Sequence, residues 1–456
     1  MFKLSRSLIV EACFLLLILG LVLAGYTSLF SADTNVKAAT RWGAEPIAFK
    51  WSMRERFGAK DKNGLVDYHW KGETQTYDDS YINPKAWTVD FNGCAGLPPQ
   101  SVLRWEIDGQ PLSETRCSFS RDFPALQIYV VKLSATTPDG QTNTAEASVT
   151  LRDLFIVSIG DSFGSGEGNP DKPRHQLKRA RWVDEPCHRS ALAGPALAAA
   201  LAEQFDPHSA VTFISFACSG AVMEHLLTST QQKGSRLVQP QLPKVFEAAG
   251  QRTIDALLVS IGGNDVQFST LVLKCIKLRH ADTDPGANQI INDGLAALPA
   301  KFGALAQRLN DPANTARVAN VFITQYPDLV RDEDRDFCDH STPVTELLFA
   351  INGAESEWAL NKVVVPLNEA IQSAATTFGW NYVDGILSKF GGDSSDHIAH
   401  GFCSGDQRWV NTFNDSWRIQ GDKNGTVHPN LDGHSWYAQR LVQALRAKGL
   451  VTLATP

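Results

Sequence analysis

The 456-residue sequence lacks the residue patterns of several common classes of functional site. It holds no Cys-x-x-Cys and no His-x-x-x-His pair, so the usual spacings of a zinc site are missing. It also has no Gly-Lys-Ser/Thr and no G-x-G-x-x-G, which are the standard phosphate-binding patterns. The formal net charge is -7 and the isoelectric point is near 5.9, so nucleic acid is an unfavourable partner. We therefore expect neither a metal ion nor an organic cofactor.

One long apolar run lies at the N-terminus. Lys3 and Arg6 precede a mostly apolar stretch at residues 8–25, and this order is typical of an export segment whose basic end stays inside. We interpret residues 1–32 as a signal peptide or an N-terminal membrane anchor, and no strong cleavage site decides between the two. Eight cysteines, one of them in this segment, suit an oxidising compartment. The sequence thus predicts a secreted or periplasmic protein, with membrane anchoring through residues 8–25 as the alternative to cleavage.

The rest of the chain is too long for one small core and predicts two domains. Residues 33–80 are polar and irregular in pattern, and we interpret them as a linker or extension. Residues 81–152 contain short alternating runs, at 87–91, 102–107, 126–134 and 145–151, separated by turn signals, a pattern typical of a small β-sandwich. In residues 153–456, strand-like runs alternate with helical segments, which predicts a parallel sheet with helices on both faces. The strand-like runs are 154–159, 211–216, 255–260, 318–324 and 380–383, and 355–378 is one of the helical segments.

The most informative stretch is 154–170, which reads LFIVSIGDSFGSGEGNP. Its first six residues predict a strand buried on both faces, and the chain then turns at Gly160. Ser162 follows at the carboxyl end of this strand, where open α/β sheets present their ligands, and is therefore a candidate nucleophile. Taken alone, this stretch also fits the G-x-S-x-G elbow of α/β-hydrolases, a phosphate cradle or an incidental glycine-rich turn.

Three later segments complete a longer pattern: FACSGA at 216–221, IGGND at 261–265 and VHPNLDGH at 427–434. Together with Gly160-Asp161-Ser162 they resemble, in residue type and chain order, the four blocks of the GDSL or SGNH hydrolase family. The resemblance covers about residues 154–450. It implies a flavodoxin-like three-layer α/β/α domain whose parallel sheet has the order 2-1-3-4-5. It also implies a serine esterase or lipase, of class EC 3.1.1, that works through an acyl-enzyme.

The same resemblance implies a role for each block. Ser162 would be the nucleophile and His428 the base that accepts its proton. The backbone N–H groups of Ser162 and Gly220 and the side-chain amide of Asn264 would form the oxyanion hole. Many family members carry an aspartate three residues before the histidine, but Gly425 stands at that position. Secreted bacterial esterases of the Streptomyces scabies type, which this chain also resembles, orient the histidine with a backbone carbonyl, and Gly425 would supply it here.

The cysteines outside the export segment resemble that subgroup in part. We expect the pairs Cys94–Cys117, Cys187–Cys218 and Cys338–Cys403, with Cys275 left free, although spacing alone does not fix the pairing. The 81–152 region resembles an immunoglobulin-like or PKD-like module, whose role would be carbohydrate or surface binding, or that of a spacer or lid.

Several alternatives stay open at this level. The ester substrate is a lipid, a polyester or an acylated glycan, which includes the activities of a phospholipase and of a sugar O-acetyl esterase, and the oligomeric state is open. A different class of function is that of a non-catalytic surface- or carbohydrate-binding protein on a hydrolase scaffold. His434 is a rival to His428 as the base. A rival metal site would use the following side chains: Asp393, Asp396, His397 and His400.

Overall fold

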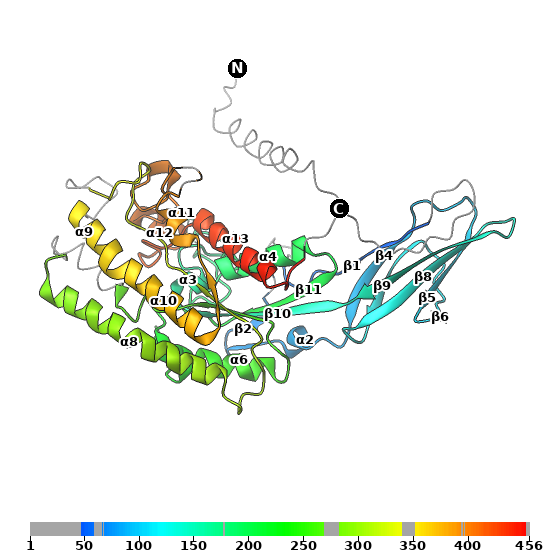
Figure 1. The fold of residues 1–456 in the computed structure, drawn as a ribbon, viewed down its shortest axis with the longest axis horizontal. Helices are drawn as coiled ribbons and strands as arrows, with labels where there is room; N and C mark the ends of the chain where they lie inside the picture. The colour runs from blue at the N-terminus through cyan, green and yellow to red at the C-terminus, as the bar shows by residue number, and fades with distance from the viewer. Residues whose placement is uncertain are drawn as a thin grey trace, which may run out of the picture.

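The computed structural model describes residues 47–58, 66, 68–176, 178–268, 282–339, 352–393, 395 and 397–452. The predicted export segment and Cys275 lie outside these residues, so the predictions about them stay predictions. Within the described ranges, no helix has the length and apolar character needed to cross a bilayer. Figure 1 shows a helix-rich region built around one sheet, with an elongated all-β region extending from its side.

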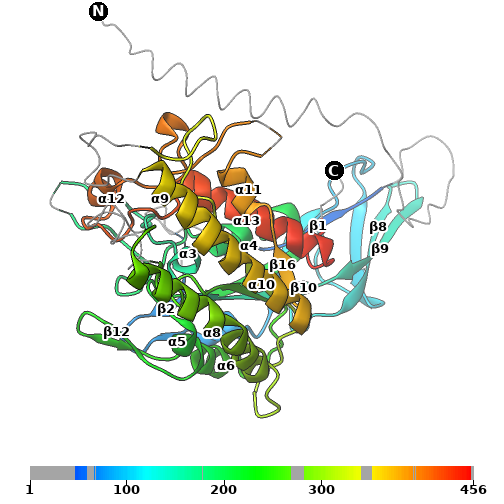
Figure 2. The same cartoon turned by 60° about the vertical axis from the view of Figure 1, so that its left-hand side comes forward.

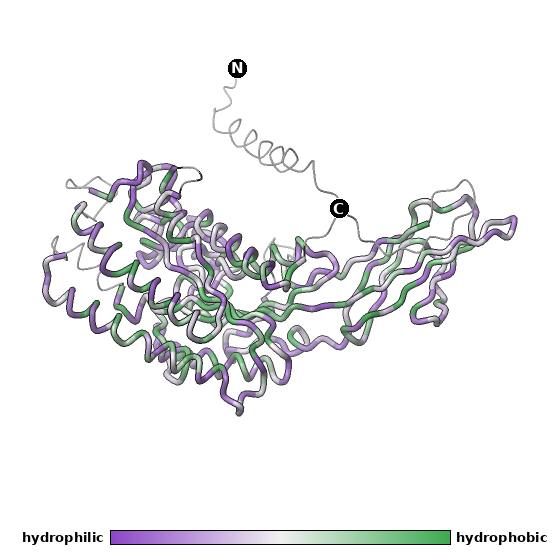
Figure 3. Tube along the Cα trace, in the orientation of Figure 1, coloured by the Kyte–Doolittle hydropathy of each residue, from purple (hydrophilic) through white to green (hydrophobic). Residues whose placement is uncertain are grey.

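A five-stranded parallel sheet forms the centre of the C-terminal region. Its strands are β10 (Arg152–Gly160), β11 (Ser209–Ser215), β14 (Ala256–Ser260), β15 (Val321–Thr324) and β16 (Asn381–Val383). They lie in the order β11-β10-β14-β15-β16, which is the predicted order 2-1-3-4-5. In the register, Val157 of β10 lies between Ile214 and Leu257 of its two neighbours. Figure 3 shows the resulting concentration of hydrophobic residues along the central strands.

Helices cover both faces of this sheet and complete three layers (Figures 1 and 2). One face carries α4 (Gly194–Phe205) and α13 (Leu431–Ala447), which pack against each other. The other face carries α6 (Gln241–Ala249), α8 (Pro285–Leu309) and α10 (Val365–Phe378). Shorter helices lie in the connections: α3 (Ser162–Ser165), α5 (Met223–Leu227), α9 (Gly353–Trp358), α11 (Ile386–Phe390), α12 (Phe413–Ile419) and the 3-10 turn Gly405–Gln407.

The sequence predicts one continuous helix over 355–378, but the structure interrupts it. Between α9 and α10 the residues Ala359–Val364 form a π-helical segment. Pro366, in the first turn of α10, has no N–H to continue the regular hydrogen-bond ladder. A π-bulge accommodates this break without ending the helix.

The all-β region consists of two antiparallel sheets that share one core. One sheet is β1 (Lys50–Met53), β4 (Trp87–Asn92) and β7 (Ser118–Phe123); the other is β6 (Gln110–Pro111), β5 (Val102–Ile107), β8 (Ile128–Thr136) and β9 (Thr142–Thr150). Trp105 lies at the centre of the core and donates a hydrogen bond from Nε1 to the carbonyl of Arg116. Strand β7 is absent from the sequence prediction because only two of its six residues, Phe119 and Phe123, are apolar.

Residues predicted as an irregular linker are ordered where the structure describes them, and they divide between the two regions. Strand β1 pairs with β4 and so belongs to the sandwich. The hairpin of β2 (Trp70–Lys71) and β3 (Thr76–Tyr77), with α2 (Asp79–Ile82), instead packs on the parallel sheet. The linker interpretation is therefore wrong for these segments, and the sandwich does not begin cleanly at residue 81.

This hairpin segment covers the edge of the parallel sheet. The hydroxyl of Tyr77 donates to the carbonyl of Ser215 at 2.7 Å and accepts from its N–H at 2.8 Å, and Tyr81 does the same for Phe213 at 3.1 and 2.9 Å. Strand β11 is the edge strand, so these backbone groups have no strand partner on that side. Two tyrosine hydroxyls satisfy them and close an edge that would otherwise invite pairing with another chain.

All three predicted disulfides are present. Cys94–Cys117 lies in the sandwich, while Cys187–Cys218 and Cys338–Cys403 lie in the C-terminal region. Each links loops rather than regular elements, so the cross-links fix the connections around the sheet.

Candidate active site

The candidate nucleophile lies at a sharp turn after the central strand. β10 ends at Gly160, whose φ of 137° and close approach to the carbonyl of Ser260 leave no room for a Cβ. Asp161 caps the short helix α3, since its Oδ1 accepts from the N–H of Phe163 at 3.0 Å. Ser162 is the first residue of α3, so its backbone N–H has no partner within the helix. This N–H is available to a ligand beside the hydroxyl.

Ser162 and His428 are brought together although 266 residues separate them. The Oγ of Ser162 lies 2.8 Å from Nε2 of His428. The other ring nitrogen, Nδ1, lies 3.0 Å from the carbonyl oxygen of Thr426. A carbonyl only accepts hydrogen bonds, so Nδ1 carries the proton and Nε2 is free to accept one from the serine.

The prediction that the carbonyl of Gly425 orients the histidine is wrong by one residue. The Gly425 carbonyl accepts the backbone N–H of His428 at 3.1 Å and is thus used in a turn. Val427 between them has a φ of 58°, in the left-handed region, and this turn presents the Thr426 carbonyl to the ring. A β-branched residue rarely adopts this conformation, so the turn could not be predicted from the residue type at this position.

Burial lowers the pKa of His428 below its ordinary value near 6.5. The negative charge of Glu167 and the hydrogen bond to Thr426 oppose this shift without cancelling it. The imidazole is therefore neutral at pH 7 and can accept a proton.

Gly220 lies in the turn after β11, with a φ of 78°. The carbonyl of the preceding Ser219 accepts two hydrogen bonds, from Nε2 of Gln231 at 2.8 Å and from Nζ of Lys233 at 3.0 Å. Both donors belong to β12 (Gln231–Lys233), which pairs with β13 (Arg236–Val238) in a hairpin. The N–H of Gly220 shares a planar peptide unit with that carbonyl, so the two donors fix its direction and polarise it.

Asn264 follows β14 and faces the same turn. Its Nδ2 donates to the carbonyl of Ala221 at 3.0 Å, which leaves a second N–H on the amide. The preceding Gly263 packs against the ring of Tyr326 and donates its N–H to the Tyr326 hydroxyl at 3.0 Å. That hydroxyl donates in turn to the carboxylate of Asp161.

Asp161 thus links the nucleophile turn to the Asn264 turn. Burial raises its pKa to about 7, although the hydrogen bonds from Tyr326 and Phe163 favour the ionised form. Its contacts are those of a brace for the turn and not those of a partner for His428.

Four blocks of sequence therefore meet at the carboxyl ends of adjacent strands. The GDSL-like lipase/acylhydrolase family model matches residues 158–436, a range that contains all four blocks and more than half of the chain. The chain belongs to the GDSL-like lipase/acylhydrolase family. Membership indicates a hydrolase that acts on esters. No curated protein matches the chain closely enough to add a more specific comparison.

The GDSL-like domain also contains a buried ion pair that sequence reasoning missed. Both carboxylate oxygens of Glu167 lie 2.8 Å from Nδ1 of His188, and Gln420 donates to the same carboxylate at 2.7 Å. Although burial opposes ionisation, the contacts with His188 and the nearby His428 lower the pKa of Glu167 to about 2. Burial lowers the pKa of His188, but the hydrogen bond with Glu167 and the negative charges of Glu167 and Asp422 together outweigh it, so the pKa is raised. No pattern in the sequence marks this pair, because its members belong to different loops.

The rival site residues have other roles in the GDSL-like domain. His434 is buried, its Nδ1 accepts the N–H of Gly194 at the start of α4 at 3.1 Å, and burial lowers its pKa to about 3. It is therefore not placed to act on Ser162. His400 stacks on Trp409 with ring centroids 3.7 Å apart and bonds the carbonyl of Gln407. Among the described residues no group of three or more metal-ligating side chains forms, and Asp396 lies outside them.

Proposed function

We propose that this protein is an exported serine esterase that hydrolyses carboxylic esters through an acyl-enzyme. The observation that carries the proposal is the 2.8 Å hydrogen bond between Ser162 Oγ and His428 Nε2, with Nδ1 held by a backbone carbonyl. A serine hydroxyl is a weak nucleophile until an adjacent base takes its proton, and this geometry supplies that base.

In the first step, Oγ of Ser162 attacks the ester carbonyl carbon while its proton moves to Nε2 of His428. The C=O bond becomes a C–O⁻ bond, and the N–H groups of Ser162 and Gly220 and the amide of Asn264 donate to this oxyanion. When the carbonyl reforms, the bond to the alcohol oxygen breaks and the alcohol leaves with the proton from Nε2.

In the second step, a water molecule replaces the alcohol. His428 accepts a proton from the water as its oxygen attacks the acyl carbon, and the same three donors meet the second oxyanion. The bond to Oγ then breaks and Ser162 regains a proton from Nε2. Because Nδ1 faces the carbonyl of Thr426, the histidine is oriented without a carboxylate, as the resemblance to Streptomyces scabies-type esterases implies.

Export is part of the proposal. Three disulfides in the described residues suit an oxidising compartment, and the N-terminal sequence 1–32 has the pattern of an export segment.

Labelling with a fluorophosphonate probe tests the assignment of the nucleophile. The probe should modify Ser162 in the folded protein, and the modified peptide should be identified by mass spectrometry. Ser162→Ala should abolish labelling, while Ser165→Ala, three residues along the same helix, should retain it. Labelling of a different residue, or none in a folded sample, would remove the serine mechanism.

A further inference from the structure

A cationic loop lies beside the candidate site, although the chain as a whole carries a net negative charge. Residues 172–181, KPRHQLKRAR, contain five lysines and arginines, one histidine and no carboxylate. Antiparallel bridges between Lys172 and Arg181 and between His175 and Lys178 fold this loop as an irregular hairpin. Such a cluster of positive charge creates a local positive potential on a chain of net charge -7, and this potential favours an anionic ligand.

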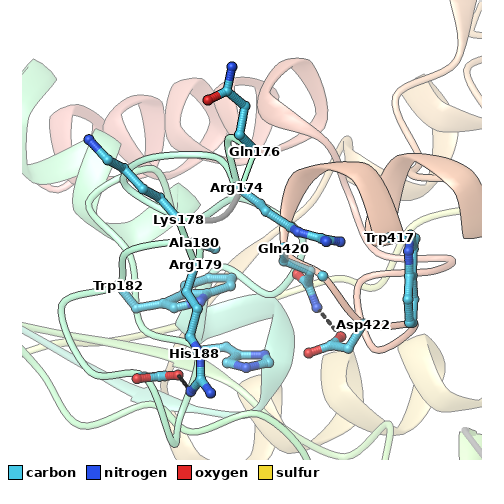
Figure 4. Close-up of a pocket in the computed structure, with 12 residues that line it drawn as sticks. Arg174, Gln176, Lys178, Arg179, Ala180, Trp182, His188, Trp417, Gln420 and Asp422 are labelled. Atoms are coloured by element: carbon cyan, nitrogen blue, oxygen red, sulfur yellow. Dashed lines mark hydrogen bonds and ion pairs between the residues drawn. The ribbon is translucent and has the colours of Figure 1, made fainter.

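A pocket of about 460 Å³ lies between this cationic loop and the end of α12 (Figure 4). Figure 4 shows Trp182 stacked over His188 on one side, Trp417 on the other, and Arg174 extending between them. The two stacked rings have centroids 4.5 Å apart and are nearly parallel, while Trp417 is 52% exposed. The volume of the pocket falls in the range of small-molecule binding sites.

The loop is fixed to the opposite wall of the pocket. The backbone N–H of Arg174 donates to the carbonyl of Ile419 at 2.7 Å. The Arg174 side chain lies over Gly421, where a Cβ would meet its Cδ at 3.3 Å and where φ is 92°. Among the described residues, no ion pair is found for Arg174 or Lys178, whereas Arg179 lies 3.8 Å from Glu185. Arg174 therefore lies at the pocket without a carboxylate partner in that part of the chain, and Lys178 lies at the rim. The carboxylates of Glu185 and Asp422 also line the pocket.

The floor of the pocket is continuous with the segment that carries Ser162. His188 and Gln420 line the pocket and both bond the carboxylate of Glu167. The backbone N–H of Glu167 donates to the carbonyl of Ser162 at 3.1 Å. His188 and Gln420 therefore join the pocket, through Glu167, to the turn that carries Ser162.

We propose that this pocket binds an anionic sugar residue of an acylated acidic glycan, next to the ester that Ser162 attacks. A guanidinium pairs well with a carboxylate, and the exposed ring of Trp417 offers an apolar face to the C–H groups of a pyranose. Ala180 is the only aliphatic side chain among the described residues that line the pocket, and apart from two indole rings the walls are polar or charged. These features favour an acidic saccharide over the tail of a lipid. The hydrolytic part of this inference rests on the proposed function, whereas the binding part does not.

Binding is tested by calorimetry on the full chain carrying Ser162→Ala, with trigalacturonate and its methyl ester as matched charged and neutral ligands. Trigalacturonate should bind, and its Kd should rise at least about tenfold, or about 1.4 kcal/mol, in the added Arg174→Gln/Lys178→Gln pair. Raising the ionic strength should also increase the Kd for trigalacturonate. The pair Lys50→Gln/Arg121→Gln, which removes two exposed charges of the sandwich, should leave Kd unchanged.

Equal binding of the charged and neutral ligands, no binding of either, or equal Kd values in the two double variants would overturn the proposal. Binding only to vesicles that contain phosphatidylglycerol, and not to trigalacturonate, would also overturn it, because the cations would then serve a membrane surface. Hydrolysis is measured separately on the chain with Ser162 intact. The Arg174/Lys178 variant should lower kcat/KM for acetylated polygalacturonate but not for 4-nitrophenyl acetate. Binding without any hydrolysis would remove the proposed function and leave the saccharide site standing.

Discussion

The two regions of this protein differ most in what they bury. Among the residues of the sandwich, 47–53 and 87–151, no buried side chain belongs to a charged residue, a histidine, an amide or an aliphatic hydroxyl. The GDSL-like region buries many such groups, among them Asp161, Glu167 and Asp265. A buried polar group destabilises a fold unless it is hydrogen-bonded, so a region that holds many of them needs a compensating network.

The difference shows which region depends on directional hydrogen bonds and which depends on apolar packing. The sandwich core depends on the fit of apolar side chains around Trp105. The GDSL-like region holds its turns with directional bonds, such as those from Tyr326 to Asp161 and from Lys233 to the Ser219 carbonyl. The following predictions ask whether changes of the same type affect turnover in one region and not in the other.

Asn264→Ala should reduce kcat by about 10²- to 10³-fold, because it removes one donor to the oxyanion. The measurement is steady-state hydrolysis of 4-nitrophenyl acetate. Asn143→Ala in β9 of the sandwich is the matched control and should leave kcat unchanged. A loss of less than threefold at Asn264 would show that its amide does not meet the oxyanion.

Lys233→Met should reduce kcat by about tenfold at nearly constant KM, because it removes a charged donor from the carbonyl that orients the Gly220 N–H. Lys233→Arg should restore most of the rate, since a guanidinium also donates to a carbonyl. Lys132→Met in β8 is the matched change in the sandwich. A rise in KM with constant kcat would indicate that Lys233 binds substrate and does not position the peptide.

The pH dependence should show a neutral base. His428 acts only when it is unprotonated, and its pKa is lowered from 6.5. The midpoint of the kcat/KM profile should therefore lie below pH 6.5, and kcat/KM should fall tenfold per pH unit below that midpoint. Between pH 6.5 and 8 the change should be less than about twofold, because the imidazole is already more than half neutral at pH 6.5. A midpoint above 6.5 in the pH profile would contradict the burial of the ring.

Trp105→Ala should have the smallest effect on turnover and a large one on stability. It removes a fully buried indole from the sandwich and should lower the free energy of unfolding by about 3 to 5 kcal/mol. Activity below the unfolding transition should match that of the unchanged protein. Denaturant unfolding followed by fluorescence, with activity measured at each point, tests both statements. A loss of turnover in the folded variant would show that the sandwich shapes the active site.

Much of the architecture could be predicted from the sequence because it depends on local patterns. Apolar runs located all five strands of the parallel sheet, and the resemblance of four motifs to a known family indicated its topology. The prediction of strands and helices was less accurate where the sequence pattern was short or mixed, as in β7. It also missed the π-helical segment that replaces a regular turn.

The chain by itself therefore located the strands of the parallel sheet, and with the family resemblance it indicated the three cysteine pairs and the four residues that we assign to the reaction. Only the tertiary structure decided that Thr426, and not Gly425, faces the histidine, because that choice depends on a left-handed turn at Val427. It also decided that Glu167 pairs with His188 and that Lys233 bonds the Ser219 carbonyl. These contacts join loops that are remote in sequence and follow no repeating period, so they exist only once the sheet has brought the ends of its strands together.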